Sequence, residues 1–345
     1  GYVGSLGRHL VRAYEADKEI VADHAAAVAA CNSMTVSDCL TMASDLSLNE
    51  PQWFTDSSGN FLSVGRVYTD GASSYNSLQV KLDKQATHGL YYILAYTYSH
   101  ALDNGSGFDS SCFGNGNDLV GSNWVPGFRQ LGYGNSEFDA RHVFRAAYGY
   151  VVPLFSSWRR NSLVNEAIGG WHITGITTFQ SGNPVSIGET GLNRSLWCND
   201  ANFSFYNCPD NPNTSTFSIP HLNPRGTNNL WFDPTVFSQE PLGTFGNVKR
   251  NFFSGPGFNY TDMELFKNFP LGHTDSPRYL ELRLEAYNVF NHPNFAGPDG
   301  DLSDGLPSQG GTFGQITSVV QPVQDAGAAE PQPGRAVQLG GKIYF

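Results

Sequence analysis

The chain ends with the stretch Arg335-Ala-Val-Gln-Leu-Gly-Gly-Lys-Ile-Tyr-Phe345, and the pattern of this stretch decides the fold class. Two sets of residues alternate in it. The apolar set, with one glycine, is Val337, Leu339, Gly341, Ile343 and Phe345, and the more polar set is Gln338, Gly340, Lys342 and Tyr344. A period of two is that of a β-strand with one apolar and one polar face. Such a strand suits the wall of a membrane barrel, where the outside contacts lipid and the inside contacts water, and it also occurs in soluble sheets.

The composition favours the membrane barrel. Only 15% of the 345 residues are charged, against roughly 25% in ordinary soluble domains, whereas 24 are Phe and 16 are Tyr. No uninterrupted apolar run approaches the ~20 residues of a membrane-spanning helix. A barrel spreads its apolar residues over alternating positions and thus combines low charge with modest hydropathy. The net charge of −11 argues against a nucleic-acid partner, because nucleic acids bind basic surfaces.

Alternation recurs along the chain and predicts an all-β fold of antiparallel strands. The strands are expected at residues 1–13, 73–84, 89–100, 140–152, 170–182, 258–269, 278–290 and 335–345. The links at 85–88, 153–169 and 270–277 are short or moderate, and those at 14–72, 101–139, 183–257 and 291–334 are long and polar. Alternate links of a meandering sheet lie at the same end. All the long links are therefore expected on one side, as in barrels with short periplasmic turns and long extracellular loops.

The strand at 278–290 has the clearest alternation. Leu280, Leu282, Leu284 and Ala286 alternate with Glu281, Arg283, Glu285 and Tyr287. A charge that faces lipid at mid-depth costs roughly 2–4 kcal/mol, so the charged set is expected on the side away from lipid. An amphipathic strand of a soluble sheet is the alternative, and the asymmetry of the links favours the membrane.

Five cysteines lie at 31, 39, 112, 198 and 208. Cys31 with Cys39, and Cys198 with Cys208, are short-spaced pairs in polar stretches, and in an oxidising compartment each pair is expected to close a small loop as a disulfide. Metal ligation is the weaker alternative, because no His or Cys partners stand at finger-like spacing. Cys112 has no assigned role.

One acidic loop is a weak candidate for calcium. Asp299, Asp301 and Asp304 place three carboxylates in a Gly-containing loop, and calcium favours such oxygen clusters. The complete calcium-loop pattern with a closing Glu is missing, so a solvated acidic loop is the default reading.

Ligand contact is expected on the long loops, because these face the medium while the strands form the scaffold. Trp124, Trp197, Trp231 and Phe232 are the aromatic candidates for stacking on a ligand, although packing of loop against loop is the favoured role for these residues. Nothing in the sequence nominates a nucleophile, an acid/base pair or a phosphate-binding loop. We therefore expect neither an enzyme nor a bound cofactor.

Several ordered segments resemble the C-terminal barrel portion of TonB-dependent outer-membrane receptors, most closely the Oar-like group abundant in Acidobacteria. The most specific is Leu284-Glu-Ala-Tyr-Asn-Val-Phe-Asn-His-Pro-Asn-Phe295. The others begin at Gly1, Tyr75, Tyr96, Phe138, Gly170, Phe179, Gly255 and Leu265. Together they extend over nearly the whole chain.

The resemblance implies that residues 1–345 form about the last eight strands of a 22-stranded barrel. The chain opens inside strand-like sequence without Met or a signal peptide, so we expect it to be a C-terminal fragment, with the plug domain and the preceding strands before Gly1. In such receptors the TonB complex acts through the plug, and the barrel-assembly machinery reads a terminal aromatic residue, here Phe345.

The implied function is the energised uptake of a nutrient such as an oligosaccharide, a peptide or a metal chelate across the outer membrane, with membrane lipid around the barrel. Two alternatives remain open. One is an adhesin-like surface barrel, and the other is a secreted β-sandwich that binds glycans.

Overall fold

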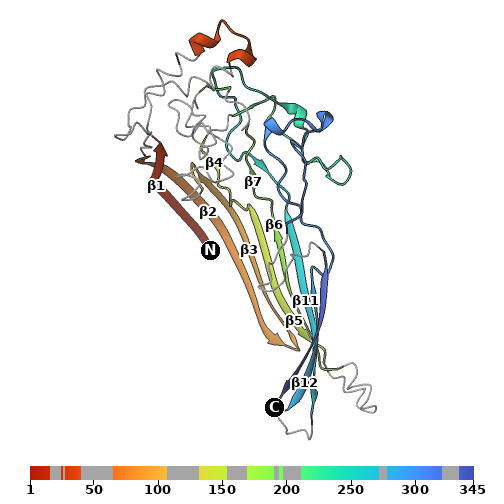
Figure 1. Ribbon diagram of the computed structural model, residues 1–345. Coiled ribbons are helices and arrows are strands. Elements are labelled where there is room, and N and C mark those ends of the chain that lie inside the picture. The colour runs from red at the N-terminus through yellow and green to blue at the C-terminus, as the bar shows by residue number, and fades with distance from the viewer. Residues whose placement is uncertain are drawn as a thin grey trace, which may run out of the picture.

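The computed structural model describes residues 1–15, 25, 28–39, 65–106, 132–153, 169–189, 194–196, 211–271, 278–320 and 334–345. Its main feature is a single antiparallel sheet of long, tilted strands (Figure 1). The strands of the main path are β1 (Tyr2–Glu15), β2 (Gly65–Thr87), β3 (Leu90–Asp103), β5 (His142–Val151), β6 (Trp171–Gln180), β11 (Phe258–Pro270), β12 (Tyr279–Tyr287) and β13 (Ala336–Tyr344). Each pairs with the next strand of this series, so the sheet is a meander with β1 and β13 at its open edges.

The predicted antiparallel strand series is confirmed, and β2 is the main departure from its expected bounds. This strand begins at Gly65 rather than near residue 73, because its first part pairs with the end of β1. Two register shifts, between Arg8 and Leu10 and between Leu10 and Arg12, accompany this pairing. A bulge breaks the period of two, so alternation in the sequence does not reveal such a segment.

The strand ends joined by the short links and those joined by the long links lie at opposite ends of the sheet, as predicted. Thr87 and Leu90 pair across a two-residue turn in which His88 and Gly89 have φ of 52° and 81°. Positive φ at both central residues is typical of the tight hairpin turn that matches strand twist. A Cβ on Gly89 would lie 2.5 Å from the carbonyl oxygen of Val151, so only glycine fits there. No helix among the described residues is long and apolar enough to cross a membrane.

Beyond the long-link end, the described residues of 181–257 and 288–320 fold into one compact unit, the loop body (Figure 1). Its elements are β7 (Pro184–Val185), β8 (Asn213–Thr214), η3 (Pro234–Val236), β9 (Phe237–Ser238), β10 (Phe253–Ser254), η4 (Leu302–Asp304) and η5 (Pro307–Gln309). β7 pairs with β10, and β8 pairs with β9. A further short strand, β4 (Gly134–Asn135), pairs with the end of β3.

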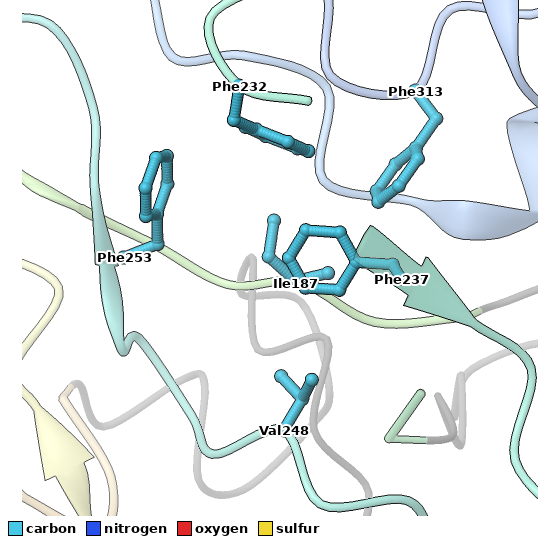
Figure 2. Packing of buried hydrophobic residues seen from close by; sticks show 6 residues of the cluster. All are labelled: Ile187, Phe232, Phe237, Val248, Phe253 and Phe313. Carbon is cyan, nitrogen blue, oxygen red and sulfur yellow. The ribbon is translucent and has the colours of Figure 1, made fainter. Parts of the chain in front are cut away.

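The loop body has its own hydrophobic core, shown in Figure 2. The core consists of Ile187, Phe232, Phe237, Val248, Phe253 and Phe313. The ring of Phe232 meets those of Phe237, Phe253 and Phe313 edge-on, with centroids 5.3–5.5 Å apart. Edge-to-face packing of this kind stabilises beyond the area that it buries. The long loops are thus a folded unit positioned on one end of the sheet.

Candidate functional site

The strand register separates the sheet into an apolar side and a polar side. Leu265 of β11 is paired with Leu284 of β12, which is paired with Leu339 of β13. Directly paired residues share a side of the sheet, so the three leucines form a continuous row. Leu339 is 84% exposed, and Leu78, Val80 and Leu82 of β2 are exposed in the same manner. An apolar row that the protein leaves uncovered is what a lipid-facing wall requires.

The polar side carries an ion cluster centred on Arg283. Its guanidinium lies 2.7 Å from Glu281, 3.1 Å from Glu285 and 3.3 Å from Glu264 of the neighbouring strand. This arrangement is the one expected from the alternation of β12. The cluster brings one guanidinium together with three carboxylates on the side opposite to the leucine row, where the lumen of a barrel would lie.

Arg250 joins the loop body to the sheet. Its side chain is fully buried and its Nη1 lies 2.5 Å from Oδ1 of Asp103, at the end of β3. Its Nη2 donates to Oγ of Ser106 at 2.7 Å. Beside it, the side-chain amides of Asn135 and Asn251 each donate to the other residue's carbonyl oxygen at 2.8 Å. These contacts fix the loop body against the top of the sheet.

Two of the predicted ligand-stacking residues lie within the loop body, and their environments differ. Phe232 is fully buried in the core, so it has the packing role favoured for these aromatic residues and is not available for stacking on a ligand. Trp231 is half-buried, stacks on His221 with centroids 4.7 Å apart, and donates from its indole nitrogen to the Ser254 carbonyl. Among the described residues, Trp231 remains a candidate for stacking on a ligand. Its exposed neighbour His221 is a second aromatic group that the sequence did not indicate. Trp124 and Trp197 lie outside the described residues.

Two buried glutamates lie close together in the loop body. Glu189 and Glu240 are 0% and 1% exposed. Gln239 donates to Glu189 at 2.8 Å, and Arg194 Nε lies 3.8 Å from the Glu240 carboxylate. Burial raises the pKa of Glu189, whereas hydrogen bonds with Gln239 and Glu240 and the charge of Arg194 act in the opposite direction. This is the most strongly buried acidic pair of the described loops, and no pattern in the sequence predicts it.

A disulfide joins Cys31 and Cys39, whose Cα atoms are 5.0 Å apart. The two cysteines and Leu196 form a second buried cluster, against which Val28 and Leu242 pack. The long link between β1 and β2 therefore packs against the long link between β6 and β11 through this cluster. Cys112, Cys198 and Cys208 lie outside the described residues, so the second predicted disulfide stays a prediction.

The carboxylates of the predicted calcium loop serve local turns. Asp299 accepts from the backbone N–H of Asp301, and Asp301 accepts from that of Ser303 as the N-cap of η4. Within the described ranges, no group of three or more His, Cys, Asp or Glu side chains has an arrangement fit for a metal ion. The structure therefore gives Asp299 and Asp301 a turn-forming role, and the part of the chain that it describes offers calcium no ligand set.

Asparagines shape the turn that follows β12. This turn belongs to residues 284–295, the segment whose resemblance to the receptor family is the most specific. Asn288 and Asn291 have φ of 48° and 53°, a region that asparagine tolerates better than most residues. The Asn288 side chain accepts from the His292 N–H and donates to the His292 carbonyl. Asn291 accepts from the N–H of Arg335, just before β13. The motif thus sets the connection between the last two strands.

Phe345 follows β13 on the apolar side of the sheet and is 93% exposed. Its recognition by the barrel-assembly machinery stays a prediction.

A family model described as an outer membrane beta barrel domain matches residues 1–338. No curated protein and no solved structure matches the chain. The family match covers nearly the whole chain, and the sheet has the alternating sides that such a wall needs. The chain therefore belongs to the outer membrane beta barrel domain family and is located in the outer membrane.

Proposed function

We propose that this chain is the wall and the extracellular loop set of an Oar-like, TonB-dependent receptor that takes up a nutrient. The observation that carries the proposal is the loop body. Long loops that cover one end of a barrel wall and fold around their own core present a defined surface to the medium. Its attachment through buried Arg250 and Asp103 holds that surface over the polar side of the sheet.

The ordered sequence segments support the receptor class, and the open sheet supports a larger barrel. The edges of β1 and β13 have no partner strand among the described residues. Unpaired backbone groups are costly in hydrocarbon, so further strands are expected to complete the wall. On this proposal the TonB complex acts through a plug domain, the assembly machinery inserts the barrel, and the role is transport without catalysis.

Uptake measurements test the proposal and identify the class of substrate. The gene is disrupted in the source bacterium, and uptake is measured with three labelled probes: a maltodextrin mixture, a tripeptide mixture and a ferric chelate. We expect loss of uptake for one probe, restoration by the full-length gene, and the same loss when TonB is depleted.

An adhesin-like barrel is the alternative that the outcome distinguishes. Unchanged uptake of all three probes, together with loss of attachment to surfaces, would overturn the transport proposal. A secreted β-sandwich is set aside, because the family match and the single sheet with an uncovered apolar side identify a membrane wall.

A further inference from the structure

The polar side of the sheet carries charges of both signs, whereas the apolar side carries cations alone among the described strand residues. Where side chains of the strands are described, the carboxylates all lie on the polar side: Asp83, Asp103, Asp262, Glu264, Glu281 and Glu285. On the apolar side of the same strands, the charged residues with described side chains are all cations: Arg8, Lys84 and Lys267. The strand register places both lysines on the apolar side. Lys84 follows Leu82 by two residues and is paired with Tyr92. Lys267 is paired with Leu282.

Both lysines stand at the end of the sheet with the short links. Lys84 lies three residues before the end of β2 at Thr87, and Lys267 lies three residues before the end of β11 at Pro270. In an outer-membrane barrel the short links are on the periplasmic side, so this rim of the apolar side meets the inner leaflet. A lysine on the lipid side is tolerated near the interface far better than at mid-depth.

Aromatic rings hold both ammonium groups in place. Lys84 Nζ lies 5.9 Å from the centroid of Tyr92. Lys267 Nζ lies 5.6 Å from that of Trp171 and 5.4 Å from that of Phe269, and it donates to the Gly169 carbonyl at 2.8 Å. Cations over ring faces are attracted by the ring quadrupole, and the rings themselves prefer the headgroup level of a bilayer.

We propose that this rim binds anionic phospholipid headgroups of the inner leaflet through Lys84 and Lys267. Charge complementarity carries the proposal, because the rim has two fixed cations and, among the described strand residues, no carboxylate on the same side. Lys84 is half-buried and contacts the headgroup phosphate, whereas Lys267 is 6% exposed and acts mainly through its charge. The two strands are four steps apart in the sheet, about 19 Å at ~4.8 Å per step, so the lysines serve separate lipids.

The test uses the full-length protein, purified in detergent and equilibrated with equal amounts of phosphatidylglycerol and phosphatidylethanolamine. Native mass spectrometry counts the lipids that stay bound. We expect phosphatidylglycerol to be retained in preference, and K84Q and K267Q each to reduce that preference about fivefold, the effect of one basic residue at an anionic surface. K84R retains the charge and should retain the preference.

Lys81 supplies the matched control, because it belongs to the same strand but to the polar side, where it pairs with Asp83 at 3.3 Å. K81Q should bind both lipids as the unchanged protein does. Equal loss in K81Q and K84Q, or no loss in K84Q, would overturn the proposal. If K267Q does not fold because Gly169 loses its donor, the comparison of K84Q, K84R and K81Q decides alone.

Discussion

At the scale of single residues, Arg250 is the side chain on which the attachment of the loop body depends most. Arg250 and Asp103 are 0% and 5% exposed, so R250A would leave a buried carboxylate without its guanidinium partner. Removal of one partner from a buried ion pair costs about 3–5 kcal/mol. We expect that loss in the stability of the loop body, measured by urea-dependent amide exchange of residues 230–255 in the membrane-inserted protein.

Two further variants serve as controls for the prediction on R250A. R145A removes an exposed arginine from the polar side of β5 and should change stability by less than about 0.5 kcal/mol. R250M/D103L replaces both partners by apolar side chains and should recover most of the loss, because no lone charge stays buried. Equal effects of R250A and R145A would show that the attachment does not depend on Arg250.

Glu189 makes the loop body sensitive to pH. Its pKa is raised above the ordinary 4.5, so the folded protein holds this proton more tightly than the unfolded chain does. The corresponding stability is fully present below pH 4.5 and is lost as the pH rises through the folded-state pKa. We expect E189Q, which cannot ionise, to gain thermal stability over the unchanged protein at pH 8 and to gain little at pH 4. The same gain at both pH values would contradict the assignment.

At the scale of elements, β12 predicts opposite outcomes for substitutions on its two sides. Leu284 lies between Leu265 and Leu339 near the middle of the apolar row, so L284K places a charge in the lipid. The expected cost is about 2–4 kcal/mol at mid-depth. Q338K introduces the same charge on the polar side, beside Glu285, and should be tolerated. Urea unfolding from phosphatidylcholine vesicles measures both, and similar losses would show that the two sides do not differ in their contact with lipid.

The strands could be predicted from the sequence because a period of two is visible within each of them, as in β12 and β13. The start of β2 could not, because the register shifts between Arg8 and Leu10 and between Leu10 and Arg12 break that period. The loop body was missed altogether. Its core rings, such as Phe232 and Phe313, come from distant links without any period, and Arg250 meets Asp103 across 147 residues. A residue that packs a loop core therefore has the same local signature as one that contacts a ligand.

At the scale of the whole molecule, the sheet has one side for lipid, one side for water and two open edges. The backbone groups along the outer edges of β1 and β13 need partners, since each unpaired group in hydrocarbon costs several kcal/mol. We therefore expect the amides of both edges to exchange as slowly as those of β5 and β6 when the full-length protein is inserted in vesicles. Rapid exchange at β13 beside slow exchange at β6 would show a sheet that stays open in the membrane.

Cross-linking then tells which strands close the wall. Leu6 and Leu339 share the apolar side and belong to the two edge strands, so the pair L6C and L339C approaches disulfide distance only if β1 and β13 pair with each other. A larger barrel, as the receptor proposal requires, keeps these strands apart, and we expect no cross-link. Slow exchange at both edges together with an absent cross-link supports the larger barrel, in which other strands cover the edges. Efficient cross-linking instead identifies a small barrel closed by this chain alone, and it would remove the lumen that a plug and its transported nutrient need.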